Sequence, residues 1–181
     1  MGAYKNAGAT YFLLGLGMFV AWLDIFIIFV PFVFYMCLFL NYYILIPLIM
    51  YLAVMFFLAG KYTIPLAEET NIDIFAIAGE FLKLHGFLLI IFLFSGFTRA
   101  FGIFLIIIFY YAGALPLILL GVSLIKLGKQ TMRLIEIEGA LILVGAILLT
   151  IAIGALIISI ALIHGGYKIT KLEEIKQNNL E

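Results

Sequence analysis

Long apolar runs, broken by short charged stretches, make up most of this chain. A helix needs about 20 apolar residues to cross a bilayer. Charged residues and turn signals divide the sequence into five runs of roughly that length. The pattern predicts an all-α, polytopic integral membrane protein with five transmembrane helices. The expected spans cover residues 10–32, 44–58, 82–97, 103–125 and 139–164.

The first apolar block, residues 7–60, holds a single charged residue, Asp24, and has room for two long spans or three short ones. A stripe of residues spaced three or four apart passes Asp24 without interruption: Phe12, Gly15, Phe19, Trp22, Phe26 and Phe29. This helical periodicity favours two spans, with one helix running from Thr10 past Val30 and a kink at Pro31. The turn to the second span is then expected at residues 41–43.

The longest polar stretch, residues 61–85, precedes the third span. Thr70 and Asp73 have the spacing of a capping box, which predicts a helix that starts near Asn71. Asp73, Glu80 and Lys83 fall on one side of that helix. We therefore expect an interfacial amphipathic helix that leads into the third span.

The last part of the chain is charged. Gly165 and Gly166 are expected to end the fifth span, since glycine often follows a helix. Residues 167–181 would then form a charged soluble tail, and residues 1–166 a single transmembrane domain.

Composition supports the membrane class. Hydrophobic residues make up 67% of the 181 residues and charged residues 11%, against about 25% charged in a soluble domain. One core of this size cannot bury that much apolar surface, which excludes a soluble enzyme and a disordered chain. The scattered Lys and Arg give no basic patch for nucleic acid. The single cysteine, Cys37, excludes a disulfide within the chain.

Five spans would place the two termini on opposite sides of the membrane. Basic residues would then divide six to four: Lys5, Lys61, Lys83, Lys126, Lys129 and Arg133 on the N-terminal side, and Arg99, Lys168, Lys171 and Lys176 on the other. This small excess favours a cytoplasmic N-terminus in the cell membrane. Three spans in the first block would equalise the two counts, so the orientation stays open.

The predicted fifth span has no aromatic side chain and is rich in small residues. These form two faces, Gly145, Ala152 and Ser159 on one and Ala146, Thr150 and Gly154 on the other. Small residues let helix backbones approach closely in lipid. The span is therefore expected to lie between two neighbouring helices. We find no convincing internal repeat and no low-complexity segment.

Asp24 is the most informative candidate for chemistry. A carboxylate in the hydrocarbon costs on the order of 3 kcal/mol or more, so it should face protein or water. Arg99, in the turn after the third span, lies at the same side of the membrane and is its natural partner, and His164 would lie nearby. This candidate polar site is either an ion or proton site or a structural ion pair.

The sequence gives no other sign of chemistry. The only histidines, His85 and His164, are separated by three spans, so they cannot hold one haem within the chain. Motifs for nucleophilic catalysis, for zinc and for phosphate loops are missing. We therefore expect no enzyme activity, no cofactor and no metal site.

The segment from Glu136 to Ala155, with Gly145 and Gly154, and the later pair Gly165 and Gly166, resembles the glycine-punctuated spans of small uncharacterised multi-span membrane proteins of archaea. The resemblance covers the last third of the chain. It implies a membrane protein of a thermophilic archaeon and assigns no catalytic residue.

Together these features predict a non-catalytic integral membrane subunit or scaffold of a membrane complex. Its expected partners are the lipid bilayer and other membrane subunits or further copies of the chain, with no nucleic acid. The alternative is a small transporter or channel that uses Asp24 as an intramembrane ion or proton site. Converging ionisable groups at depth would favour the alternative.

Overall fold

The computed structural model describes residues 2–28, 34–95, 102–131, 135–148 and 153–178. Side chains are described for all of these except 24–28, 34–45, 92, 94–95, 102–112 and 176–178. The described part of the chain holds six helices and no strand. They are α1 (Ala3–Ile28), α2 (Phe34–Thr70), α3 (Ile74–Ser95), α4 (Gly102–Gln130), α5 (Glu136–Ile147) and α6 (Ile153–Asn178).

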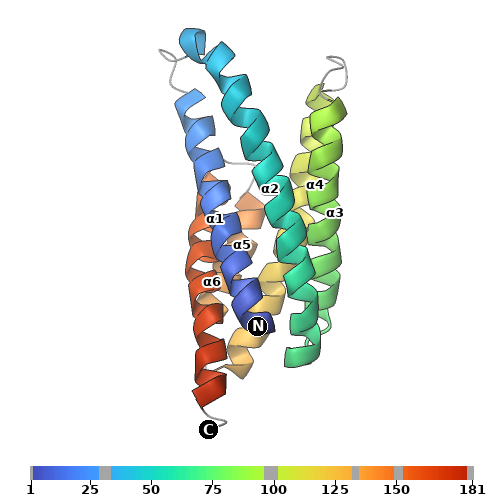
Figure 1. Cartoon of the computed structure of the whole chain (residues 1–181), viewed down its shortest axis with the longest axis vertical. Coiled ribbons are helices and arrows are strands. Elements are labelled where there is room, and N and C mark those ends of the chain that lie inside the picture. The colour runs from blue at the N-terminus through green and yellow to red at the C-terminus, as the bar shows by residue number, and fades with distance from the viewer. Residues whose placement is uncertain (1, 29–33, 96–101, 132–134, 149–152, 179–181) are drawn as a thin grey trace.

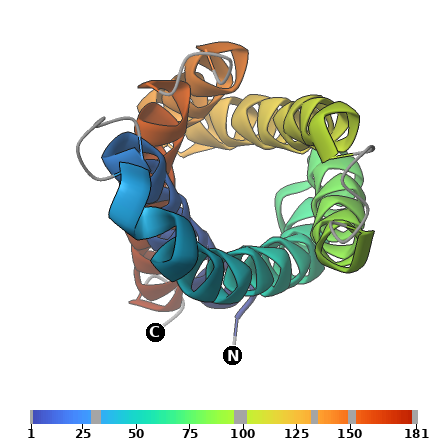
Figure 2. The same cartoon turned by 90° about the horizontal axis from the view of Figure 1, so that it is seen from above.

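The helices stand side by side in a single ring, each antiparallel to the next (Figure 1). Seen from above, the ring runs from α1 through α6 in chain order, and α6 closes it against α1 (Figure 2). Side chains fill the inside of the ring. The largest fully buried ones are Tyr11, Phe75, Leu14, Leu66, Leu82, Leu117, Leu120, Leu124, Leu127, Ile135, Ile142 and Ile158.

Five helices are long and apolar enough to cross a membrane, as the sequence predicts. The qualifying segments are Ala3–Leu23, Ile46–Thr70, Ile74–Ile91, Gly113–Gln130 and Ile153–Ile175. The fold is therefore all-α and polytopic, and its class is that of an integral membrane protein.

The prediction that residues 139–164 form one spanning helix is wrong. The chain there forms two antiparallel helices, α5 and α6, which bring the side chains of Glu138 and His164 to 2.7 Å. A continuous helix would hold these residues about 39 Å apart. Gly145 and Gly154 allow the reversal, because a Cβ on Gly145 would lie 3.0 Å from the carbonyl oxygen of Gly154.

This hairpin also places the two termini at the same end of the bundle, where the sequence predicts opposite ends (Figure 1). The backbone N–H of Lys5 donates to Oε2 of Glu173 over 3.4 Å. Because α5, which is not among the five candidate spans, runs antiparallel to α6, the hairpin returns the chain to the end of the bundle at which α4 finishes.

Two predicted boundaries are also wrong. Residues 41–43 lie inside α2, and the break between the first two helices falls between Ile28 and Phe34. Pro31, where the sequence predicts a kink, lies outside the described residues. At the other terminus, residues 167–178 continue α6 rather than form a soluble tail. Ile169 is fully buried there, which explains why the helix extends.

The predicted amphipathic segment forms the first turns of α3, directly after a tight turn. The Thr70 hydroxyl does not cap α3, because it donates to the carbonyl oxygen of Leu66 over 2.5 Å. Asn71 makes the turn in the left-handed region, with φ of 56°. Asparagine tolerates this conformation better than most residues.

The structure reveals a threefold internal repeat that the sequence analysis misses. Three helix pairs, α2–α3, α4–α5 and α6–α1, pack backbone to backbone through small residues. A Cβ on Gly60 would lie 2.4 Å from the carbonyl oxygen of Gly79. The matching distances are 2.8 Å from Gly121 to Gly139 and 2.5 Å from Gly166 to Gly8. The three junctions between the pairs are packed less closely.

Burial follows the same repeat with the same spacing. The helices α2, α4 and α6, each the first member of its pair, bury matching residues at the glycine contact. These are Phe56, Ala59 and Gly60 in α2, Leu117, Leu120 and Gly121 in α4, and Leu162, Gly165 and Gly166 in α6. The partner helices α3, α5 and α1 also bury matching residues. These are Ala78, Gly79, Leu82 and Gly86 in α3, Glu138, Gly139, Ile142 and Ala146 in α5, and Ala7, Gly8, Tyr11 and Gly15 in α1. The chain therefore comprises three equivalent helix pairs, the third of which is split by the termini.

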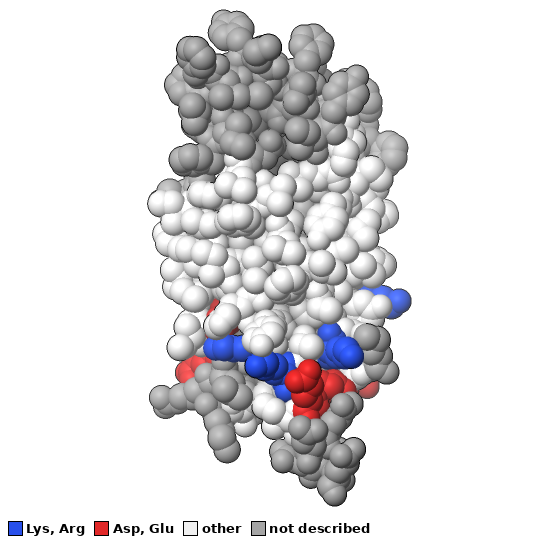
Figure 3. Space-filling view, turned by 60° about the vertical axis from the view of Figure 1, so that its left-hand side comes forward, with Lys and Arg blue, Asp and Glu red and all other residues white. Residues whose placement is uncertain are grey.

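The described charged side chains gather at one end of the bundle, below a white apolar belt (Figure 3). We call this the charged end. It comprises Lys5, Lys61, Glu68, Glu69, Asp73, Glu80, Lys83, Lys126, Lys129, Glu136, Glu138, Lys168, Lys171, Glu173 and Glu174. These residues lie at the starts of α1, α3 and α5 and at the ends of α2, α4 and α6.

Candidate functional site

A buried ionic cluster joins α5 to α6 near the charged end. Glu138, in the first turn of α5, exposes only 2% of its surface. Its Oε1 atom accepts a hydrogen bond from Nζ of Lys168 over 2.7 Å and lies 2.7 Å from Nδ1 of His164. Lys168 and His164 are four residues apart, so they share one face of α6. Helix geometry thus aims two nitrogen donors at one carboxylate oxygen.

The two α6 side chains connect this buried carboxylate to the outside. The side chain of His164 is 60% exposed, and that of Lys168 is 28% exposed. Oε2 of Glu138 is buried and has no hydrogen-bond partner among the described residues. The carboxylate is therefore held through one oxygen, while the other remains available to a proton or a hydrogen-bond donor.

Two features of the surroundings of Glu138 shift the pKa of its carboxyl group in opposite directions. Burial raises the pKa of the Glu138 carboxyl, whereas the hydrogen bonds from Lys168 and His164 lower it. The lowering prevails, and the net pKa lies below the ordinary value. Breaking a buried pair by removing one partner leaves an uncompensated charge, which is strongly destabilising. The cluster thus acts as an ionic link between α5 and α6.

Glu138 breaks the threefold repeat. The equivalent residues are Ala7 in α1 and Ala78 in α3, both fully buried. In the other two repeats, the position of His164 is occupied by Leu58 and Leu119. The position of Lys168 is occupied by Tyr62 and Ser123. Of the three junctions between pairs, only the one between α5 and α6 carries acidic or basic side chains at these positions.

The predicted pairing of Asp24 with Arg99 is not tested by the described residues, whereas the position of His164 is described. Arg99 and the side chain of Asp24 lie outside the described residues. The backbone of Asp24 belongs to the last turns of α1, whereas His164 lies level with the first turns, since Gly8 contacts Gly166 and Gly15 contacts Ser159. His164 therefore lies far from Asp24 along α1, and its partner is Glu138.

The predicted small-residue faces divide between two helices. Thr150 and Ala152 lie outside the described residues. Gly145 of α5 packs on Gly154 and Ile158 of α6, so both helices of the hairpin contribute. Ser159 faces away from the hairpin, toward Gly15 of α1, where a Cβ would lie 2.8 Å from the Ser159 carbonyl oxygen.

His85 is a second buried polar group. It lies within α3 at 7% exposure, edge-on to the ring of Phe56 with 4.6 Å between ring centroids. Gly113 of α4 makes room for it, because a Cβ there would approach the imidazole to 2.9 Å. Its Nδ1 has no hydrogen-bond partner among the described residues.

The sequence analysis leaves Glu138 just outside the predicted fifth span, residues 139–164, and does not identify it as a site residue. The signal was its place beside Gly139 and four residues before Ile142 in an apolar helix, a spacing that Ala78, Gly79 and Leu82 repeat. Within the described residues, no group of three His, Cys, Asp or Glu side chains could hold a metal ion.

Comparison with protein-family models, curated proteins and solved structures finds no significant match for this chain. The class of the protein therefore rests on its own fold, a polytopic α-helical membrane protein built from three helix pairs.

Proposed function

We propose that this protein is a non-catalytic integral membrane subunit, a scaffold that holds other subunits of a membrane complex. The observation that carries the proposal is the closed ring of three helix pairs, each packed backbone to backbone through small residues. Close packing of small residues stabilises helix association in lipid. A ring closed between the first and last helices resists deformation, as a scaffold requires.

The charged end faces the cytoplasm in this proposal. Every described lysine side chain lies at that end. Arg133 falls between the charged ends of α4 and α5, and Lys176 near the end of α6, which leaves Arg99 alone in a connection of the opposite end. By the positive-inside rule, this distribution of basic residues favours a cytoplasmic charged end. The preference is much stronger than the one given by the six-to-four distribution of the five-span topology. Both termini are then cytoplasmic.

The test is the composition of the protein as extracted from its native membrane. A scaffold should leave the membrane in mild detergent together with partner subunits at a fixed stoichiometry, measured by native mass spectrometry. The partners should survive a wash at high salt if helices in the membrane hold them. Recovery of the chain as a monomer, at every detergent concentration that keeps it folded, would contradict the proposal.

A second candidate, a small transporter or channel, is favoured by the α5–α6 hairpin. The 12 residues of α5 rise about 18 Å, against about 30 Å of hydrocarbon. Ile147, at the end of α5, matches Phe87 in the repeat, and α3 continues beyond Phe87 to Ser95. The hairpin therefore reverses within the membrane. Such discontinuous helices mark the binding sites of many transporters.

Cysteine accessibility separates the two candidates. Ile147 and Phe87 lie at the same depth in the repeat, and both are exposed on the ring. In a Cys37→Ser background, Ile147→Cys should react with a membrane-impermeant reagent only if water reaches the hairpin tip. Phe87→Cys is the matched control that faces lipid. Equal protection of both cysteines supports the scaffold, and selective labelling of Ile147→Cys supports the transporter.

A further inference from the structure

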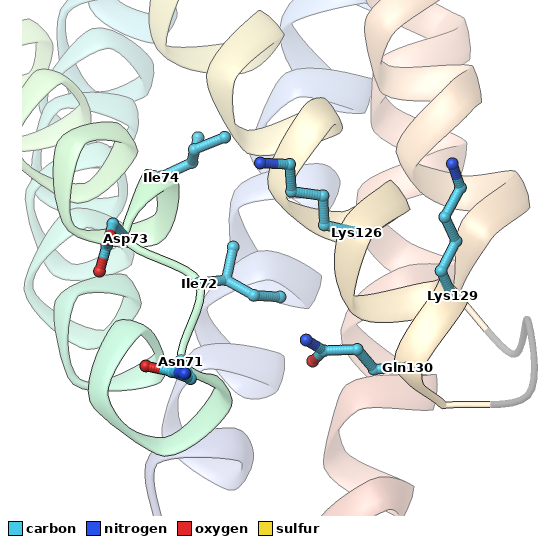
Figure 4. A pocket seen from close by; sticks show the side chains of 7 residues that line it. All are labelled: Asn71, Ile72, Asp73, Ile74, Lys126, Lys129 and Gln130. Carbon is cyan, nitrogen blue, oxygen red and sulfur yellow. The ribbon is translucent and has the colours of Figure 1, made fainter.

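A polar pocket of about 410 Å³ opens at the charged end between α3 and α4 (Figure 4). One wall is the turn before α3, with Asn71, Ile72, Asp73 and Ile74. The other is the end of α4, with Lys126, Lys129 and Gln130. Figure 4 shows α3 and α4 in front and α1 and α6 behind, so the pocket opens on the outside of the ring.

The pocket is cationic. Lys126 extends across it toward Ile74, and the carboxylate of Asp73 points away from both lysines (Figure 4). Among the described side chains, neither Lys126 nor Lys129 has an acidic partner within ion-pair distance. By contrast, Lys83 pairs with Glu80 and Lys168 with Glu138. The two pocket lysines therefore keep their charge available to an anion.

The threefold repeat shows that this charge is not a general feature of the helix ends. Lys126, Lys129 and Gln130 of α4 correspond to Pro65, Glu68 and Glu69 in α2, and to Lys171, Glu174 and Ile175 in α6. At these positions α2 carries two negative charges and α6 carries one of each sign. Only the junction between α3 and α4 presents two cations without an acid on the same helix end.

We propose that this pocket binds the phosphate of an anionic membrane lipid. Its depth supports this source, because its lining combines apolar Ile72 and Ile74 with Lys126 and Lys129 of the charged end. Lipid headgroups occupy that level of a bilayer, and basic pockets between transmembrane helices on the cytoplasmic side bind anionic headgroups. Ile72 and Ile74 offer an apolar wall to the glycerol and the first acyl carbons.

The lysines suit a site at the membrane interface. Long lysine side chains lay their methylene stems along apolar surface and keep the ammonium group at the headgroup level. The Lys126 ammonium extends over the pocket, the Gln130 amide lies at its lower edge, and Lys129 lines its α4 side with the ammonium turned away from Lys126 (Figure 4). Lys126 is therefore the principal donor for the phosphate oxygens, and Lys129 adds to the positive charge of the same helix end. An acidic segment of a partner protein would meet the same charges, but nothing in the pocket's apolar wall favours a peptide.

The experiment uses the full chain in nanodiscs of phosphatidylcholine with increasing phosphatidylglycerol, and native mass spectrometry counts the retained lipids. Wild-type protein should retain phosphatidylglycerol in preference to phosphatidylcholine. Since a lysine near the membrane surface contributes about 1 kcal/mol to anionic lipid binding, Lys126→Gln should weaken retention about fivefold. Lys126→Gln with Lys129→Gln should weaken it about 25-fold.

Lys171→Gln is the matched control, because Lys171 occupies the repeat position of Lys126 in α6 and is likewise exposed. It should change lipid retention less than twofold. Equal losses from Lys126→Gln and Lys171→Gln would overturn the proposal in favour of general surface attraction. Unchanged retention in the double variant would overturn it directly.

Two further probes distinguish the sources of the anion. Inorganic phosphate at millimolar concentration should not displace phosphatidylglycerol or raise the melting temperature in phosphatidylcholine discs. If it does both, the site binds free phosphate and the lipid assignment is wrong. A poly-glutamate peptide that binds in phosphatidylcholine discs, with loss of binding in the double variant, would instead identify a protein-docking site.

Discussion

Gly166 of α6 lies against Gly8 of α1 so closely that a Cβ on Gly166 would come 2.5 Å from the Gly8 carbonyl oxygen. Real Cβ atoms do not approach backbone oxygens to that distance. The contact repeats those of the α2–α3 and α4–α5 pairs, although its two residues come from opposite ends of the chain. The ring is therefore closed by the same interaction that forms each of its other pairs.

Gly166→Leu should open this contact. The added side chain would meet the backbone of Gly8 and of Phe12, whose N atom lies 2.6 Å from the ideal Cβ position, and backbone cannot yield as a side chain can. Overpacking of this kind lowers the free energy of unfolding by about 1–3 kcal/mol. Denaturant titration in detergent measures the change. The exposed Ile160→Leu, on the same helix, should cost less than 0.5 kcal/mol, roughly as expected for a surface change.

A circular permutant should fold. The termini meet at the charged end, where Lys5 and Glu173 are hydrogen bonded, at the place where the other pairs have their short connections. Joining the termini with a flexible linker and opening the chain between α4 and α5 would move the split from the third pair to the second. We expect a melting temperature within a few degrees of the wild type. A permutant that does not fold with any linker length would argue against equivalence of the three pairs.

Both termini should be labelled from one side of the membrane. In a Cys37→Ser background, Lys5→Cys and Glu174→Cys lie at exposed positions of the charged end. An impermeant reagent should reach both in inside-out vesicles and neither in sealed cells. Labelling of the two positions from opposite sides would restore the five-span topology and remove the α5–α6 hairpin.

The class of the fold and the number of apolar helices follow from the sequence, because the energetic cost of charge in lipid separates the spans. The end of the first helix was harder to predict. The stripe that begins at Phe12 correctly indicates a continuous helix through Asp24, but the turn predicted from Asn41 to Tyr43 lies inside α2.

The α5–α6 hairpin escaped prediction for a different reason. Residues 139–164 are apolar throughout, and a reversal within the membrane needs no charged residue to mark it. Its signal is the pair Gly145 and Gly154, which reads equally well as packing on one straight helix. Once the hairpin was missed, Glu138 and His164 fell on opposite sides of the membrane, and their contact could not be anticipated.

The ionic link of Glu138 should make the stability of α5 depend on pH. Because the pKa of Glu138 is lower in the folded protein than its ordinary value of 4.5, the link stabilises the fold above that value. The contribution is lost as the pH falls through the lower, folded-state pKa. Glu138→Gln should remove this part of the acid destabilisation, as measured by hydrogen exchange of α5 and α6. Glu80→Gln, which breaks an exposed pair, should leave it in place.

Glu138→Ala combined with Lys168→Ser would give the α5–α6 junction the two residues, Ala78 and Ser123, that occupy the equivalent positions between α3 and α4. The double variant should be more stable than Glu138→Ala alone, since the single change leaves Lys168 without its partner. If the two variants unfold at the same denaturant concentration, Lys168 without its partner costs the fold nothing, which contradicts this expectation.

The junction between α1 and α2 offers a buried hydrogen bond for comparison. The Thr63 hydroxyl donates to the carbonyl oxygen of Ala59 over 2.5 Å, so the Tyr11 hydroxyl, 2.7 Å from Thr63 Oγ1, acts as the donor to it. Tyr11→Phe removes this donor and leaves Thr63 bonded to Ala59, at a cost of about 1 kcal/mol. Thr63→Val should cost more, about 1–3 kcal/mol, because it strands the buried tyrosine hydroxyl.

The other two junctions indicate which residues can replace Tyr11 and Thr63. Leu82 with Leu124, and Ile142 with Ile169, occupy the positions of Tyr11 and Thr63, and all four are buried. Tyr11→Phe with Thr63→Val should therefore unfold close to Tyr11→Phe alone, since no polar group is then stranded. A double-mutant cycle in detergent measures the coupling. Strictly additive losses would mean that the Tyr11 hydroxyl does not depend on Thr63, and that this hydrogen bond does not hold α1 to α2.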